Sequence, residues 1–185
     1  MEMTLDVSHQ LVRDAAVSAR CSMFSTRRLS KEDATEFQKL RLEGLKRHPD
    51  SFGASFSIEA RQKLKFFADT LEKGVVFGGY DGTKLQGIVG FRRHQHEKMK
   101  HKGSLISMYV REESRGTELA VKLVQALLEH ARQEVELVQL CVVSSNEQAR
   151  RCYEKCGFEV YGVEPKALKV GESYFDELLM WVKLT

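Results

Sequence analysis

The sequence predicts a mixed α/β (α+β) domain with a mixed, mostly antiparallel sheet of six or seven strands and helices on both faces. Short apolar runs alternate with longer segments that carry an apolar stripe at helical spacing. Asp81-Gly82 separates two of the apolar runs and is a strong hairpin signal. A helix-length segment separates two later runs, which predicts one parallel crossover.

The composition predicts a single soluble domain. The chain has 185 residues, of which 42% are hydrophobic and 30% charged, and domains of this length bury roughly 70% of their unfolded surface. The 29 basic and 26 acidic residues are interleaved, so a nucleic-acid partner is not required. No apolar leader and no run of roughly 18 apolar residues occurs, which favours a cytoplasmic protein without membrane contact. The four cysteines follow no disulfide framework.

The chain is expected to divide at residue 21. Residues 1–21 carry apolar side chains near helical spacing, among them Leu5 and Val12, and are interpreted as an accessory N-terminal helix or extension. Residues 22–185 hold every other predicted element and form the domain. The expected state is a monomer or a homodimer, with the extension packing or oligomerising.

The first predicted elements of the domain are a strand and two helices. The strand covers residues 22–29, and the helix after it begins behind the N-cap Ser30. That helix ends before Pro49, because the residue that precedes a proline disfavours the helical conformation. A second helix covers residues 60–74 and ends at its glycine.

Strands predominate in the remainder. Two strands flank Asp81-Gly82, and two more are expected at residues 103–110 and 137–143, with a helix between them. Another helix covers residues 146–158. The tail supplies two final strands around a loop that holds Pro165 and Gly171.

The turn RGTELA, residues 115–120, joins the strand at residues 103–110 to the next helix. A helix N-terminus carries unpaired N–H groups and about half a positive charge, so this junction suits an anion such as a diphosphate. Arg115 adds a full charge, and Gly116 lets a ligand approach the backbone. Glu118 repels such an anion unless its side chain points to solvent. Taken alone, the turn leaves open the simpler interpretation of a helix start without a ligand.

A second motif, NEQARRCYEKCGF, follows the strand at residues 137–143. Asn146 can cap the helix, and Tyr153 lies two turns further along the same face. Seven residues rise about 10 Å along a helix. One extended ligand can therefore meet an amide at one end and a phenol at the other, although a buried core tyrosine is the alternative.

Together the two motifs resemble the acetyl-CoA-binding half of the GNAT superfamily of N-acetyltransferases. The family's first motif has Arg or Gln, two residues, Gly, one residue, and Gly or Ala; Arg115 and Ala120 match it, and Glu118 stands in the glycine place. The second motif is matched by five residues, Asn146, Ala149, Tyr153, Gly157 and Phe158. Residues 22–185 are then expected to form a GNAT-type domain, and the loop at residues 47–55 resembles a substrate-side loop of the family.

The resemblance implies that the fourth and fifth strands form a splayed parallel pair with the pantetheine arm of acetyl-CoA between them. Backbone groups of Met108, Tyr109 and Val110 would bind that arm, and Asn146 would contact it. The residues expected around the phosphates are Arg115, Gly116, Thr117, Glu118, Leu119, Ala120 and Arg150. Tyr153 would protonate the departing CoA thiolate as the general acid.

The expected function is therefore an acetyl-CoA-dependent N-acetyltransferase that moves an acetyl group directly to a primary amine of a small molecule or peptide. Acetyl-CoA is the cosubstrate. The general base stays unassigned: Glu59, Asp176 and Glu177 are candidates for the acceptor side, but surface charges and a water chain are alternatives. A non-catalytic acyl-CoA-binding regulatory module is the second hypothesis, because of Glu118 and the missing base. An interaction protein that binds no nucleotide is the third.

The histidines and cysteines are interpreted without a metal or redox role. His94, His96 and His101 have no cysteine or paired carboxylate nearby to complete a ligand set, so a solvated basic loop is expected and no metal. Cys152 and Cys156 are spaced for packing on the sheet. Cys141 alternates with apolar strand residues and could face the cleft.

Overall fold

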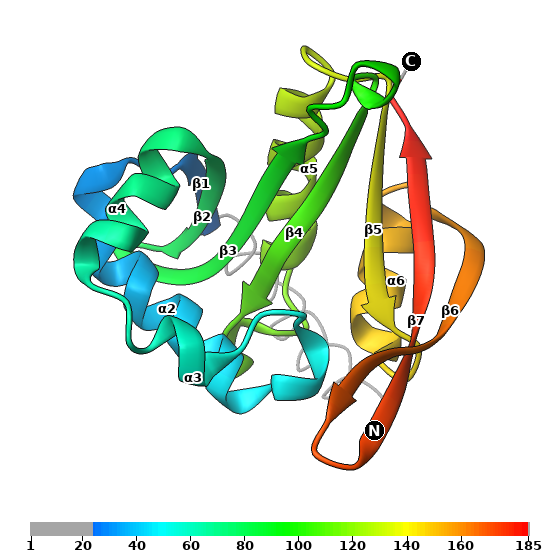
Figure 1. Cartoon of the computed structure of the whole chain (residues 1–185). Helices are drawn as coiled ribbons and strands as arrows, with labels where there is room; N and C mark the ends of the chain where they lie inside the picture. The colour runs from blue at the N-terminus through cyan, green and yellow to red at the C-terminus, as the bar shows by residue number, and fades with distance from the viewer. Residues whose placement is uncertain (1–23, 185) are drawn as a thin grey trace, which may run out of the picture.

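A computed structural model describes residues 24–184, so the accessory helix predicted at residues 1–21 lies outside the described residues. The described chain forms one seven-stranded sheet with the order β1-β2-β3-β4-β5-β7-β6 (Figure 1). The strands are β1 (Phe24–Arg28), β2 (Val75–Asp81), β3 (Lys84–Arg93), β4 (Lys102–Val110), β5 (Leu137–Val143), β6 (Glu159–Val170) and β7 (Ser173–Lys183). The α-helices are α2 (Ala34–Arg47), α3 (Phe56–Glu59), α4 (Leu64–Lys73), α5 (Leu119–Ala131) and α6 (Glu147–Lys155).

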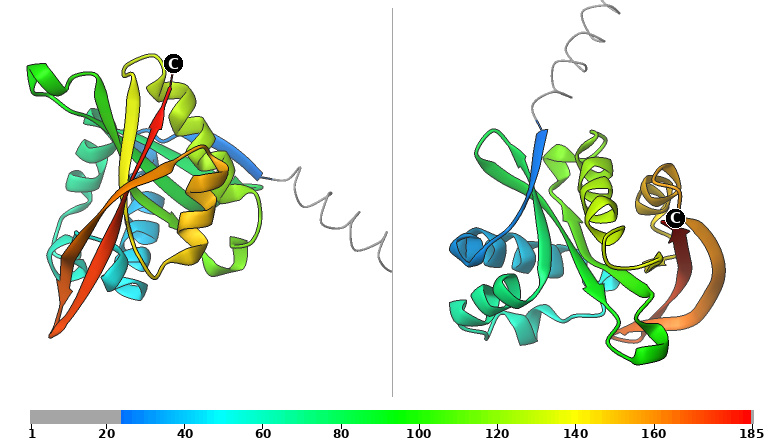
Figure 2. Two further views of the ribbon diagram at one scale, coloured as in Figure 1. Left: turned by 90° about the vertical axis from the view of Figure 1, so that its right-hand side faces the viewer. Right: turned by 90° about the horizontal axis from the view of Figure 1, so that it is seen from above.

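All neighbouring strands are antiparallel except β4 and β5. This confirms the predicted mixed, mostly antiparallel sheet with one parallel pair. Helices cover both faces: the views in Figure 2 place α2 and α4 on one side of the sheet and α5 and α6 on the other. Each side has its own apolar core, around Phe37, Leu40 and Phe67 under the first pair and around Leu123, Leu127 and Val138 under the second.

The α2 helix begins with a local polar contact and ends where the sequence predicts. A short 3₁₀ turn (Lys31–Asp33) precedes it. The Asp33 carboxylate accepts a hydrogen bond from the Ser30 N–H at 2.9 Å. It also accepts hydrogen bonds from NH1 and NH2 of Arg27. The helix ends at Arg47, before a second 3₁₀ turn, η2 (Pro49–Ser51). The helix predicted at residues 60–74 begins later, at Leu64, and the separate short helix α3 was not predicted.

The C-terminal hairpin differs from the prediction in one respect. Its turn holds Gly171, at φ +59°, but Pro165 lies inside β6 rather than in the loop. Because β6 is an edge strand, its proline interrupts no central ladder. The register of β6 against β7 also shifts between Glu164 and Leu168, where Lys166 has φ +54° and donates its N–H to Asp176 Oδ1.

The parallel pair is splayed. Only Lys102, Gly103 and Ser104 of β4 are paired with β5, whereas β5 stays paired with β7 as far as Val143. Within the described chain, the β5-facing edge of β4 from Leu105 to Val110 has no strand partner, and Figure 1 shows the two strands diverging. A register shift against β3 at this point coincides with Ser107 at φ +57°, so a bulge bends β4 where it leaves β5.

Candidate active site

A cleft of about 810 Å³ lies between the diverging ends of β4 and β5. Four parts of the chain line it: residues 48–52 before α3, the second half of β4, the turn at residues 115–117 with the start of α5, and the end of β5 with α6. The volume falls in the range of roughly 300–1,000 Å³ that is usual for small-molecule sites. We refer to it as the β4–β5 cleft.

Most of the residues selected from the sequence line this cleft. They are Met108, Tyr109, Val110, Arg115, Gly116, Thr117, Ala120, Asn146 and Tyr153. Three others do not: Glu118, Leu119 and Arg150. Leu119 is fully buried in the core under α5, so only its backbone can contribute to a site.

Arg150 faces away from the cleft. Its Nε donates to Glu154 Oε1 at 2.8 Å on the exposed side of α6. Arg151 and Lys155, on the same helix, line the cleft instead. The spacing of Arg150 and Glu154, four residues apart with opposite charges, was the sequence signal for this pairing.

The turn at residues 115–118 combines one obligatory glycine with a regular helix start. Gly116 has φ +73°, which favours glycine, and open space lies where a Cβ would stand. The Thr117 hydroxyl donates to the Ser114 carbonyl at 2.7 Å and accepts the Leu119 N–H at 3.3 Å. Glu118 has φ −75° and ψ −4°, an ordinary helical conformation, so glycine is not needed at this position.

The Glu118 carboxylate lies outside the cleft. Its side chain is 57% exposed and lies 3.8 Å from Lys122 Nζ, one turn along α5. An exposed charge is screened by solvent, which weakens the repulsion that the sequence suggested.

Arg115 connects the turn to residues 48–52. Its Nε donates to the Val110 carbonyl at 3.0 Å, and its NH2 lies 2.8 Å from His48 Nε2. A guanidinium can only donate, so His48 Nε2 accepts and the imidazole proton sits on Nδ1. This contact holds the His48 ring at the edge of the cleft.

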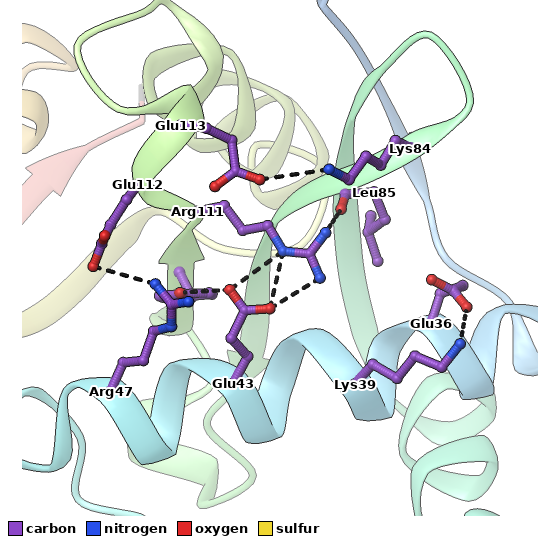
Figure 3. Close-up of polar contacts among 10 residues, drawn as sticks. Glu36, Lys39, Glu43, Arg47, Lys84, Leu85, Arg111, Glu112 and Glu113 are labelled. Carbon is purple, nitrogen blue, oxygen red and sulfur yellow. Dashed lines mark hydrogen bonds and ion pairs between the residues drawn. The ribbon is translucent and has the colours of Figure 1, made fainter.

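A second polar cluster supports the floor of the cleft (Figure 3). Tyr109 OH donates to the Glu43 carboxylate at 3.1 Å, and Arg111 forms an ion pair with the same carboxylate at 3.0 Å. NH1 of Arg111 donates to the Leu85 carbonyl. Burial and the nearby Glu43 charge raise the pKa of Tyr109 to about 12. The cluster fixes α2 to the end of β4. Gly44 leaves room for the contact, since a Cβ there would lie 2.9 Å from the Tyr109 ring.

Asn146 and Tyr153 lie on α6 as the sequence predicts. The Asn146 side-chain oxygen accepts the Ala149 N–H at 3.1 Å and caps the helix, which leaves its amide NH₂ as a donor. Tyr153 is 5% exposed and packs edge-on against Phe158. Burial raises the pKa of Tyr153 above its usual value. Its phenol therefore keeps its proton at neutral pH.

The three carboxylates considered for the acceptor side lie elsewhere. Glu59 forms a two-point ion pair with Arg41, at 2.8 and 3.0 Å. Asp176 accepts the Lys166 N–H, and burial with a nearby Glu164 raises the pKa of Glu177. Of the residues that the structure describes, these three are not among those lining the cleft.

The loop at residues 47–55 lines the cleft with residues that were not individually predicted from the sequence. His48, Asp50, Ser51 and Phe52 all line it. The loop resemblance was the only signal for them, and it named a region rather than residues.

The remaining polar features form no second centre. Cys141 lines the cleft as expected, and burial, Glu177 and Glu164 raise the pKa of its thiol. Over residues 24–184, no group of three His, Cys, Asp or Glu side chains is arranged to hold a metal ion, and His94 Nε2 contacts Ser104 Oγ at 3.0 Å. No helix in the described chain is both long and apolar enough to cross a membrane.

Comparison with known sequences identifies similar proteins. Residues 38–158 match the family model described as Acetyltransferase (GNAT) family. Two L-methionine sulfoximine/L-methionine sulfone acetyltransferases, from Pseudomonas paraeruginosa and Pseudomonas aeruginosa, are each 35% identical over 133 residues, which cover 71% of this chain and 68% of theirs.

Solved structures show the same fold at low sequence identity. A GNAT acetyltransferase from Streptococcus pneumoniae has a TM-score of 0.78 and 20% identity over 88% of this chain and 99% of its own. The yncA protein of Salmonella typhimurium, solved with its cofactor acetyl-CoA, has a TM-score of 0.73 and 16% identity over 88% of this chain and 95% of its own.

Proposed function

Since the chain belongs to the GNAT family and is an acetyl-CoA-dependent N-acetyltransferase, we propose that its acceptor is the α-amine of a small amino acid. The 35% identity to the two Pseudomonas enzymes supports this acceptor class, because their names specify L-methionine sulfoximine and L-methionine sulfone. Phe52 and Met108 line the cleft and offer apolar surface to a methionine-like side chain. The same proposal has the enzyme act in the cytoplasm, as a monomer or homodimer, without nucleic acid.

The early end of the β4–β5 ladder supports the placement of acetyl-CoA. Beyond Ser104 and Gln139, the backbone of β4 faces an open cleft instead of a strand. The amide groups of an extended pantetheine arm can bind there as an added strand, along Met108, Tyr109 and Val110. The amide NH₂ of Asn146 would donate to the same arm.

The phosphates of acetyl-CoA would bind at the turn before α5. The first N–H groups of α5 have no partner within the helix, and Gly116 lets the diphosphate approach them. Arg115 brings a positive charge to this end of the cleft. On α6 we assign the phosphate contact to Arg151 and Lys155 in place of Arg150, because both line the cleft.

In this arrangement the amine nitrogen attacks the thioester carbonyl and CoA leaves as a thiolate. Holding the two reactants together can supply about 7–11 kcal/mol of the barrier. We assign Tyr153 as the general acid that protonates the thiolate. Its buried, neutral phenol at the cleft wall supports the role, which is typically worth about 100- to 10,000-fold in rate.

A thiol-release assay with acetyl-CoA tests the acceptor class. We expect turnover with L-methionine sulfone and L-methionine sulfoximine, and slower or no turnover with an aminoglycoside or with a peptide that has a free N-terminus. A preference for the peptide would overturn the amino-acid assignment. Acetyl-CoA binding by calorimetry without thiol release on any amine would favour a regulatory module, and no thermal shift with CoA would favour an interaction protein.

A further inference from the structure

We propose that Asp50 is a catalytic residue of this enzyme, which binds the ammonium of the acceptor and takes its proton. This inference rests on the proposed function, because it assigns the base for the same acetyl transfer. It names the general base, which was left unassigned from the sequence alone.

The other proton acceptors on this side of the cleft are already engaged. His48 Nε2 accepts from Arg115 at 2.8 Å, so its lone pair already has a donor. Tyr109 OH donates to Glu43, and its raised pKa keeps it protonated. The Cys141 thiol also has a raised pKa and remains neutral.

The only other carboxylate that lines the cleft, among the described residues, is Glu147. It lies in the first turn of α6, on the side assigned to the cofactor, and is paired with Arg150 at 4.0 Å and Arg151 at 3.6 Å. Asp50 has only a weak contact, from the Ser51 hydroxyl at 3.4 Å. A carboxylate in this state can accept a strong hydrogen bond from an ammonium group.

The position of Asp50 suits an acceptor. It lies in η2, which follows α2 and packs against both β5 and β6. In Figure 1 this cyan segment lies between the lower end of β4 and the C-terminal hairpin. Asp50 is half-buried and lines the cleft. A substrate that enters the cleft beside η2 would bring its amine past the Asp50 carboxylate before the amine reaches the splayed strands.

The electrostatic surroundings of Asp50 are mixed. The titratable and charged groups on its own loop, on the neighbouring side of the cleft and on β6 are His48, Tyr109, Arg115, Cys141, Glu159, Tyr161, Glu164, Lys166 and Lys169. The helix α2, which also packs against η2, adds Glu36, Lys39, Arg41, Glu43, Lys46 and Arg47. Arg115 is the fixed positive charge among the cleft-lining members of this set. It lines the same cleft as the Asp50 carboxylate.

The proton balance is complete with Asp50 as the first acceptor. The ammonium gives one proton to the Asp50 carboxylate, which releases it to solvent. The neutral amine then forms the C–N bond, and the C–S bond of the thioester breaks. The second proton lost from nitrogen balances the one that the CoA sulfur gains through Tyr153, so each turnover releases one proton.

Asp50→Asn tests the proposal, measured by thiol release over a range of pH. We expect kcat/KM for the amino-acid acceptor to fall by about 100- to 10,000-fold at neutral pH. The deficit should shrink as pH rises and the acceptor amine loses its proton without help. Acetyl-CoA affinity by calorimetry should be unchanged.

Asp69→Asn is the matched control, because it removes a carboxylate from the surface of α4, where Lys65 is its partner. It should keep the wild-type rate. An Asp50→Asn enzyme that keeps the wild-type rate, or that loses the same factor at every pH, would overturn the assignment. If the wild type itself releases no thiol with any amine, the proposed function fails rather than this inference.

Discussion

At residue 118 a glutamate stands in the glycine place of the family motif, and the structure explains why the fold accepts it. A glycine is obligatory only where the backbone needs a left-handed conformation or a ligand needs the space of a side chain. Glu118 has an ordinary helical conformation and points to solvent, whereas Gly116, two residues earlier, has φ +73°. The sequence alone could not settle this, because a motif records residue types and not side-chain directions.

Glu118→Gly is therefore expected to change acetyl-CoA affinity by less than about threefold, since the carboxylate is exposed and screened. It should cost up to about 1 kcal/mol in stability, because glycine weakens a helix start that does not need its freedom. Calorimetry and thermal unfolding measure the two effects. Gly116→Glu is the contrasting variant and should lose most of the affinity. A tenfold gain in affinity for Glu118→Gly would show that the carboxylate does reach the phosphates.

Tyr153→Phe separates the acid role from a packing role. The variant keeps the ring that contacts Phe158 and loses only the hydroxyl. We expect kcat to fall by about 100-fold or more with little change in acetyl-CoA affinity. Stopped-flow thiol release and calorimetry measure the two quantities. A wild-type rate would remove Tyr153 from the acid role.

Which side chains of α6 face the cleft could be predicted only in part. Asn146 and Tyr153, on one helical face, line it as expected. Arg150 and Arg151 are adjacent in sequence and differ by about 100° around the helix axis, so composition could not tell them apart. In the structure Arg151 lines the cleft, whereas Arg150 turns to Glu154 on the exposed side of the helix.

At the scale of elements, the end of α6 places its motif residues against the sheet. Gly157 has φ +89°, and the Gly157 and Phe158 N–H groups donate to the carbonyls of Glu154 and Tyr153 at 3.0 and 3.1 Å. This is the hydrogen-bonding pattern of the Schellman motif, in which a right-handed helix ends at a residue with positive φ. The motif glycine therefore has a structural purpose: it reverses the chain so that Phe158 packs beside Tyr153.

Gly157→Ala should destabilise the fold by about 1–2 kcal/mol, because an L side chain is strained in the left-handed region. For a chain of this size the melting temperature should fall by about 2–8 °C. Space is not the cause, since the new Cβ would lie 3.6 Å from Val182. Gly53→Ala, in open space without a positive φ, should change stability by no more than about 0.5 kcal/mol. Equal effects of the two variants would contradict this explanation.

Most element types could be predicted from the sequence, and the errors have local causes. Alternating apolar patterns located all seven strands of the described chain. Pro165 was placed in a loop because a proline removes a ladder donor, but an edge strand tolerates this loss. The splay came from the family resemblance. Hydrophobic pattern alone shows that two strands are neighbours, and not where their pairing stops.

At the scale of the whole molecule, the N-terminal strand is tied to the first helix by the Arg27–Asp33 pair. Its closest contact is 2.6 Å, and the hydrogen bonds from Arg27 lower the pKa of Asp33 from 3.8 to about 2. A depressed carboxyl pKa contributes stability above the unfolded pKa, and that contribution is lost as pH falls from about 4 towards 2. The pair should therefore support the fold at neutral pH and not in strong acid.

Asp33→Asn should lower the free energy of unfolding at pH 7 by about 1 kcal/mol, a value reduced for screening because Arg27 is half exposed. The difference from the wild type should shrink as pH falls from 4 towards 2. Urea unfolding at a series of pH values measures it, and Arg27→Gln should show the same trend. A difference that stays constant down to pH 2 would exclude this ion pair as its source.

Among residues 24–184, three residue pairs form the ladder that joins the two halves of the sheet across β4 and β5. A molecule that binds along the unpaired part of β4 takes the place of the missing strand. It therefore stabilises the folded chain as well as taking part in the chemistry. At a hundred times its dissociation constant, such a ligand adds about 2.7 kcal/mol. We therefore expect the abundance of this enzyme in a cell to follow the concentration of acetyl-CoA, because the chain without bound ligand is less stable and is degraded more readily by proteases.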